Sequence, residues 1–331
     1  MKFKLSPLIF FILLLFTATT QAATIKIATL SPDGTTWMKK MRAAAKEIAT
    51  RTDNRVKIKF YPGGVMGNEN AILRKMRINQ LQGAAVSSGA LQRYYADVEI
   101  YSMPFIFNSH DEVLYVRKKM DNLIIEGLEK GGLISFGIAE SGFAYILSNK
   151  PIKGVSELRK QKAWIPDTAS ARNAVKAFKI KPIPLPFSDV LAALQTSLVD
   201  TIAISPIASI ALQWHTQVKY LTEMPLLYGW GTLVINKRTM NKLKAADKKT
   251  VTEILNRTFN EIDAVNQKDN SAALAALKNQ GITFVKPDSK QRAEWKKLAQ
   301  DGNSTLVDKG LHTKMMYDLI NKHISDFQKT K

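Results

Sequence analysis

Apolar and polar positions along the chain follow two periods, which predict an order of strands and helices. In residues 24–29 and 56–61 apolar side chains fall at every second position, the spacing of a half-buried strand. Apolar positions three and four residues apart predict helices over 37–48 and 70–78, and the apolar run 83–86 predicts a buried strand. This β-α-β-α-β order predicts a largely parallel sheet with right-handed crossovers.

A second α/β unit is predicted between residues 155 and 204. Before it stand two strand-like runs, 134–139 and 144–147, separated by a segment in which Gly142 allows a tight turn. We expect these runs to form a hinge between two lobes, and the apolar run 228–236 to lead the chain back to the first lobe. The predicted strands of the second unit are 162–165, 181–185 and 201–204, and its predicted helices are 169–178 and 188–197.

The longest uninterrupted helical pattern covers residues 246–280, which contain neither Pro nor Gly. Between Val251 and Ile262 apolar residues keep the spacing of one helix face. At ~1.5 Å per residue this helix would be ~50 Å long, so we expect it to lie across both lobes. The alternative is two helices with a break near residues 266–270. Two more amphipathic helices are predicted, at 291–309 and 315–328.

The first 22 residues have the pattern of a secretory signal peptide. Lys2 and Lys4 form a basic start, residues 8–16 an apolar core, and Thr20-Gln21-Ala22 a cleavage site with small residues. The apolar run of ~10 residues is too short for a bilayer span, which needs ~20. We therefore predict export, cleavage near Ala22 and a periplasmic location. The absence of cysteine rules out a disulfide framework.

A formal net charge of +20 raises the question of nucleic-acid binding. The basic residues are scattered, however. Lys57 and Lys59, for example, alternate with apolar residues on a predicted strand and therefore face solvent. This distribution argues against a nucleic-acid partner and favours attraction to anionic membranes or partners.

Motifs of catalysis and metal binding are absent from the sequence. The four histidines are isolated and lack metal-ligand spacing. The sequence contains no Gly-x-Ser-x-Gly elbow, phosphate loop or dinucleotide fingerprint. We therefore predict no catalytic residue, no metal and no cofactor. A secreted enzyme and a structural or chaperone-like periplasmic protein remain the alternative classes.

Ligands of α/β sheets bind beyond the carboxyl ends of the strands, so the residues that follow strands are candidates for a binding site. Ser87 and Ser88 follow a predicted strand. They could cap the next helix, or their backbone N–H groups could also bind a polar ligand group. Several aromatic residues also fall near strand ends, and their convergence on one crevice would favour a mainly apolar small-molecule pocket.

A series of ordered segments is typical of one protein family. The segments include Ile27–Pro32, Arg55–Gly67, Ser88–Leu91, Met103–Phe107 and Pro186–Gln195. Through them the chain resembles the extracytoplasmic solute receptors of tripartite ATP-independent periplasmic (TRAP) transporters, of the dicarboxylate-receptor type. The resemblance implies two lobes that close on a small molecule and deliver it to a membrane permease driven by an ion gradient.

The predicted fold is therefore α/β, the two-lobed fold of periplasmic binding proteins, with a hinge between the lobes and a long helix that spans both. Lobe I is expected to comprise residues 23–147 and about 234–260. Lobe II is expected to comprise 148–233 and part of 261–310, and residues 311–331 to form a C-terminal helix.

Trp164 departs from the family at the position that bears on the ligand. The resemblance implies an Arg there, whose guanidinium makes two hydrogen bonds to a substrate carboxylate. Trp offers one N–H donor and a large apolar face instead. Shortly after Asp200, where the family has polar residues that include a ligand-binding Asn, this chain has the mainly apolar segment 201–206. We therefore hypothesise a ligand more apolar or aromatic than a simple dicarboxylate, with Trp164 as a stacking wall.

Two alternatives for the ligand stay open. One is an organic acid held by Lys162, Arg172 or the N–H groups near Ser88. The other is a cation over Trp164. Glu69, which matches an acidic position of the family's motif, would then supply the counter-charge, although it would otherwise be only a first-turn helix acid.

The predicted partners are a small-molecule ligand and TRAP permease subunits. A branch of the family that lacks the Arg is paired with a periplasmic helical-repeat protein, which is therefore a further candidate. The predicted ligand-binding residues are Trp37, Glu69, Ser87, Ser88, Phe105, Phe143, Trp164, Phe187, Ile204, Ser205 and Trp230.

Overall fold

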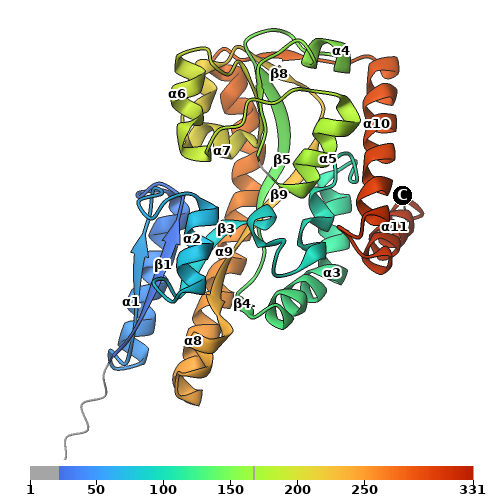
Figure 1. The fold of residues 1–331 in the computed structure, drawn as a ribbon. Helices are drawn as coiled ribbons and strands as arrows, with labels where there is room; N and C mark the ends of the chain where they lie inside the picture. The colour runs from blue at the N-terminus through green and yellow to red at the C-terminus, as the bar shows by residue number, and fades with distance from the viewer. Residues whose placement is uncertain (1–21, 167, 331) are drawn as a thin grey trace, which may run out of the picture.

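One continuous mixed sheet forms the centre of the molecule (Figure 1). The computed structural model describes residues 22–166 and 168–330, so the predicted signal peptide lies outside it except for Ala22. The strands are β1 (Ala23–Thr29), β2 (Val56–Tyr61), β3 (Gly83–Ser87), β4 (Leu133–Ser135), β5 (Ala139–Ser148), β6 (Ala163–Trp164), β7 (Thr201–Ile204), β8 (Tyr220–Thr222), β9 (Leu227–Asn236) and β10 (Thr283–Val285). Their main order is β10-β8-β5-β9-β3-β1-β2, with β4 beside β9, and β7 and β6 beside β5.

Helices cover the faces of the sheet (Figure 1). The α-helices are α1 (Thr36–Arg51), α2 (Glu69–Arg77), α3 (His110–Lys130), α4 (Val155–Leu158), α5 (Ala169–Phe178), α6 (Val190–Gln195), α7 (Pro206–Ala211), α8 (Lys237–Asn241), α9 (Ala245–Asn279), α10 (Ser289–Asp308) and α11 (Lys314–Gln328). The 3-10 helices are η1 (Ser88–Leu91), η2 (Ala96–Ser102), η3 (Phe187–Asp189) and η4 (Trp214–Gln217). Within the described residues no helix is long and apolar enough to cross a lipid bilayer.

Lobe I is built on β1, β2, β3, β4 and most of β9. As predicted, β1 pairs in parallel with β2 and β3, whereas β9 runs antiparallel to β3. Met41 of α1 and Leu255 of α9 belong to one core cluster, and Leu73 of α2, Val116 of α3 and Ile320 of α11 belong to another. The sheet of lobe I is therefore buried between two sets of helices.

Lobe II is built on β6, β7, β8 and β10, and β5 joins it to lobe I. The first part of β5 pairs with β9, and Tyr145–Ser148 pair with β7. We predicted a break between two strands at Glu140–Phe143, and that position was wrong. The break falls at residues 136–138, and the register shift between Glu140 and Gly142 is absorbed inside β5 as a bulge.

The predicted strand at 181–185 was wrong, since this segment forms no strand in the structure. Pro182, Pro184 and Pro186 lack the backbone N–H groups that a sheet ladder requires. One ladder-like bond remains, from Ile183 N to Ala163 O at 2.8 Å. The apolar alternation indicated an extended segment, and the prolines prevented its pairing.

The long helix α9 is unbroken over 35 residues, so the prediction of a single helix is confirmed and the alternative of two helices is wrong. Val251 and Ile262 are buried in the lobe I core that contains α1. Leu277 is buried in a core of lobe II, beside Trp164 and Leu221. The helix therefore spans both lobes, as Figure 1 also shows.

Candidate functional site

Several exposed or half-buried residues lie side by side on the middle strands of the sheet, where the two lobes meet. Ser87 at the end of β3 is exposed, and Ser141, Gly229 and Gly231 on the neighbouring strands are half-buried. The strand registers place Gly231 opposite Ser87 and Gly229 opposite Gly142. Because glycine has no side chain, the backbone of β9 is left uncovered along this strip. A Cβ on Gly231 would lie 3.0 Å from Val86 O.

Ser205 lies on the lobe II side of this junction, immediately before α7. Its hydroxyl oxygen is 2.9 Å from that of Ser141 on β5, so the two share a hydrogen bond. Ser205 is buried, and Ile204 beside it belongs to the core of lobe II. Of these two predicted residues, Ser205 contributes a polar group to the junction and Ile204 contributes packing.

Glu69 and Ser87 are brought together on the lobe I side. The Glu69 carboxylate accepts hydrogen bonds from Ser87 N at 2.6 Å and from Ser87 Oγ at 2.8 Å. Burial raises the pKa of the Glu69 carboxyl, and the bonds from Ser87 lower it. Ser87 precedes η1, but its side chain makes no capping hydrogen bond, and Ser88 is buried. The donors of Ser87 therefore serve Glu69 in this conformation.

Trp164 lies at the centre of an aromatic cluster in lobe II, which consists of Trp164, Phe187 and Trp214. Trp164 is only 3% exposed, and its ring centroid lies 5.9 Å from Phe187 and 5.4 Å from Trp214, both edge to face. Its Nε1 donates to Leu185 O at 3.0 Å. Phe187 is the half-buried member. The aromatic cluster thus presents Phe187 outward, with Trp164 as its support.

The remaining predicted aromatic residues do not join this cluster. Trp37 packs edge to face on Phe259 of α9, with ring centroids 6.2 Å apart. Phe143 packs on Tyr228, and Phe105 packs on Trp295 of α10.

Trp230 is likewise separate from the aromatic cluster. It is 2% exposed and packs against Tyr101 in the core of lobe I. The structure therefore distributes the predicted aromatic residues among several cores and brings only Trp164 and Phe187 into contact with each other.

The side chains proposed for an organic-acid clamp also have other contacts. Lys162 Nζ donates a hydrogen bond to Ser197 O at 3.2 Å. Lys162 immediately precedes strand β6, and Trp164 is the last residue of that strand. Arg172 is exposed on α5, and its charge lowers the pKa of Glu99.

Glu99 joins lobe I to the start of α5 in lobe II, a contact that we did not predict. The side chain is 2% exposed, and its Oε2 accepts a hydrogen bond from Ser170 N at 3.3 Å. A Cβ on Gly89 would lie 2.3 Å from Thr168 Cγ2, so only glycine allows this close approach. The available signal was a pair of acids in a buried stretch, Asp97-Val-Glu-Ile-Tyr101, since acids are rarely fully buried unless paired.

Burial raises the pKa of the Glu99 carboxyl above its ordinary value of 4.5, and hydrogen bonds from Ser170 and Thr168 lower it. A carboxyl with a raised folded-state pKa stabilises the fold fully below its ordinary pKa, and this stabilisation is lost as the pH rises through the raised pKa. We expect Glu99→Gln to remove this loss. Urea unfolding at about pH 4.5 and about pH 7.5 should show a smaller fall in stability for the variant than for wild type. The exposed Glu294→Gln should behave as wild type, and an equal fall in all three proteins would contradict the role of Glu99.

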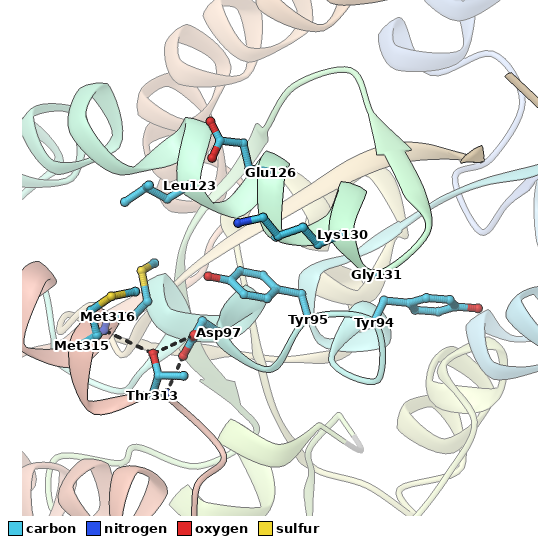
Figure 2. Close-up of a pocket in the computed structure, with 11 residues that line it drawn as sticks. Tyr94, Tyr95, Asp97, Leu123, Glu126, Lys130, Gly131, Thr313, Met315 and Met316 are labelled. Carbon is cyan, nitrogen blue, oxygen red and sulfur yellow. Dashed lines mark hydrogen bonds between the residues drawn. The ribbon is translucent and has the colours of Figure 1, made fainter. Parts of the chain in front are cut away.

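Within the described residues no group of three or more His, Asp or Glu side chains could hold a metal ion. A hollow of about 610 Å³ lies elsewhere, between η2, α3 and α11, as Figure 2 shows. None of the predicted binding residues lines it. The junction carries the hydroxyl groups of Ser87, Ser141 and Ser205 and the carboxylate of Glu69, which are polar groups of the kind that orient a small molecule.

Residues 27–305 match the family model of bacterial extracellular solute-binding protein, family 7. The chain belongs to this family. A solute-binding protein of Verminephrobacter eiseniae is 26% identical over 254 residues, which are 75% of each chain. The C4-dicarboxylate-binding periplasmic protein DctP of Rhodobacter capsulatus is 22% identical over 265 residues, 78% of this chain and 80% of the other.

A solved structure of a TRAP periplasmic solute-binding protein from Shewanella oneidensis has the same fold. It is 17% identical, with a TM-score of 0.84, and covers 92% of this chain and 100% of the other. The predictions of a two-lobed binding-protein fold and of a TRAP-type solute-binding protein are thereby confirmed. Family 7 proteins of this type bind small organic solutes and deliver them to membrane permease subunits.

Proposed function

We propose that this family 7 protein captures a ligand with an apolar or aromatic body at the lobe junction. The observation that carries the proposal is the aromatic cluster. Where the resemblance implies a carboxylate-binding Arg, Trp164 is buried against Phe187 and Trp214, and its single N–H is bonded to Leu185. A carboxylate placed there would lose its hydration without gaining a charged partner, which costs several kcal/mol.

The polar groups of the junction support the same proposal. Glu69 and Glu99, which accept hydrogen bonds from Ser87 and Ser170, both come from lobe I. The negative charge of these two carboxylates repels a carboxylate on the ligand and favours a neutral or cationic ligand group. The proposed ligand therefore combines an apolar body, packed on Phe187, with a neutral polar or cationic group near the hydroxyl groups of the junction, those of Ser141 and Ser205.

An organic acid is the second candidate. The similar Shewanella oneidensis structure contains bound succinate. In this chain Arg172 at the start of α5 is the cationic side chain that stands nearest in sequence to the junction contacts of Thr168 and Ser170. An acid would need that guanidinium, since Lys162 Nζ bonds to Ser197 O.

A thermal-shift screen of the chain without residues 1–22 tests the two candidates. The panel contains succinate, sugar acids, aromatic acids, quaternary amines and lipids. A ligand at about 100 times its Kd stabilises the fold by about 2.7 kcal/mol, so a true ligand gives a clear shift. We expect the largest shifts from compounds with an aromatic or apolar body, and we expect Phe187→Ala to weaken them.

Phe284→Ala is the matched control, because Phe284 is half-buried against the same lobe II core but lies on the distant strand β10. It should lower stability without changing the ligand-induced shift. The proposal would be wrong if succinate gave the largest shift and Phe187→Ala left that shift unchanged.

We also propose the finer features that accompany this role. Cleavage near Ala22 would release the mature chain into the periplasm, as the pattern of residues 1–22 indicates. A periplasmic helical-repeat protein is a proposed additional partner, supported by the Trp at position 164. The absence of enzymatic activity is likewise proposed, on the basis of the family and the binding chemistry of the junction.

A further inference from the structure

Three arginines from separate segments line one hollow of about 390 Å³ on lobe I. Arg77 ends α2, Arg93 lies between η1 and η2, and Arg238 belongs to α8. No carboxylate is among the described residues that line the hollow. The rest of the lining consists of Met76, Tyr94, Gly132 and Asn236.

These guanidinium groups have no counter-charge in the described part of the chain. All three arginines are exposed, and none makes a hydrogen bond or an ion pair through its side chain with another described residue. Arg42 and Arg55, in contrast, are paired with Asp33 and Asp247. Like charges gathered around one hollow repel one another, and a bound anion would relieve this repulsion. A guanidinium presents a planar fork of donors that matches phosphate and carboxylate oxygens.

The hollow is separate from the lobe junction. It lies at the end of β9, whose last residue is Asn236, and Ile235 before it pairs with Gly83 at the start of β3. The junction lies at the other end of β3, at Ser87. A strand rises ~3.3 Å per residue, so the two places are more than ~10 Å apart along the sheet. A ligand at the junction therefore leaves the hollow free.

Tyr94 connects this hollow to the neighbouring one between α3 and α11, which Tyr94 also lines. Two glycines at the C-terminal end of α3 allow the segment that contains Tyr94 and Tyr95 to pack closely against this helix. A Cβ on Gly131 would lie 2.2 Å from Tyr94 O, and one on Gly127 would lie 2.5 Å from the Tyr95 ring. Figure 2 shows Tyr95 near the centre of the second hollow, with Lys130 and Asp97 around it and Leu123 and Met315 farther to the side. Apolar side chains of the second hollow thus adjoin the arginines, together with the charged side chains of Asp97, Glu126 and Lys130.

We propose that Arg77, Arg93 and Arg238 form a binding site for a phosphate group, distinct from the solute site at the junction. The phosphate is either free or the headgroup of an amphiphile. In the second case the apolar part lies past Tyr94, against the lining of the neighbouring hollow. The proposal does not depend on which solute the junction binds.

Isothermal titration calorimetry of the mature protein with inorganic phosphate and with dihexanoyl phosphatidic acid, at constant ionic strength, tests the site. The variant Arg77→Gln/Arg93→Gln/Arg238→Gln should bind at least one probe about tenfold or more weakly than wild type, because the loss of even one charged hydrogen bond weakens binding about tenfold. The matched control is a triple Lys→Gln variant at exposed positions, which removes the same total charge and should bind as wild type. Its positions are Lys268, Lys290 and Lys297.

The two probes distinguish the sources of the phosphate. Equal affinity for both supports a free anion. Tighter binding of phosphatidic acid that is weakened by Tyr94→Ala supports a headgroup with its apolar part beyond Tyr94. If neither probe bound, or if both triple variants bound alike, the site would be refuted. Binding to phosphatidylglycerol vesicles without binding of either soluble probe would also refute it, since that pattern indicates general attraction of a basic protein to a charged membrane.

Discussion

Replacing Arg117 with Met is expected to lower the free energy of unfolding by about 3 to 5 kcal/mol, because it leaves largely buried carboxylates without their cation. Arg117 is 6% exposed. Its guanidinium donates to Asp121 Oδ2 and to Asp263 Oδ1, each at 3.0 Å, and to Tyr228 OH at 3.1 Å. A fourth bond goes to Ile138 O at 2.9 Å. The substitution therefore removes the donor from four partners at once.

The contacts of Arg117 extend to the strand that joins the lobes. Tyr228 OH donates to Glu140 Oε2 at 3.1 Å, and His110 Nε2 lies 2.7 Å from the same oxygen. Asp263 in turn accepts a bond from Glu140 N at 2.8 Å. The network therefore ties α3, β5, β9 and α9 together beside the bulge of β5. Its loss is expected to loosen the part of β5 that joins the lobes.

Urea unfolding at neutral pH measures the effect of Arg117→Met. The control is Arg257→Met, since Arg257 is 52% exposed and pairs with Glu47 on the surface. Exposed ion pairs contribute about 0 to 1 kcal/mol, so this variant should unfold close to wild type. A loss below about 1 kcal/mol for Arg117→Met would show that the buried carboxylates find other partners or take up protons.

The period of the apolar residues was sufficient to predict local elements. The ranges of β2, α5 and β7 agree with the predicted ranges, and α9 differs by one residue at each end. In these segments the apolar residues recur with a clear strand or helix period. The prolines of 181–185 were also visible, but we gave the alternation more weight than the missing N–H groups.

The contacts between distant segments could not be predicted in the same way. Arg117, Glu140 and Asp263 lie on three elements that only the folded sheet brings together. Helix α3, which carries Arg117, was not among the predicted elements. The contact of Glu99 with Ser170 likewise joins residues 71 positions apart. A sequence shows that such polar residues stand in buried stretches, but it does not show which partners satisfy them.

The candidate site stays a prediction, because no bound ligand defines it. The structure brings Glu69 into contact with Ser87, and Trp164 into contact with Phe187, although neither contact was predicted. Six aromatic residues were predicted to bind the ligand, because they stand near predicted strand ends or lobe junctions. Trp230, however, points into the core of lobe I, since alternate residues of β9 face opposite sides of the sheet. The face of the sheet to which a β9 side chain points depends on the pairing register of the strand. The apolar pattern alone did not determine that register.

Replacing Trp164 with Ala is expected to lower the free energy of unfolding by about 3 to 5 kcal/mol, the usual cost of truncating a large buried aromatic side chain. The substitution removes two edge-to-face contacts, with Phe187 and Trp214, and leaves Leu185 O without its donor. Trp164→Phe keeps an aromatic ring and loses the hydrogen bond. It should therefore cost less, about 1 to 3 kcal/mol. Urea unfolding at one pH compares the two variants.

Trp164→Arg separates a structural role of this side chain from a role in choosing the ligand. If the aromatic cluster is a closed core, a guanidinium in it is a buried unpaired charge, and the variant should be at least as unstable as Trp164→Ala and should not bind succinate. A Trp164→Arg protein that folded as stably as wild type and bound succinate would contradict this expectation. Such a result would show that the position opens on the ligand. The ligand class of this receptor would then be set by one residue on an otherwise unchanged scaffold.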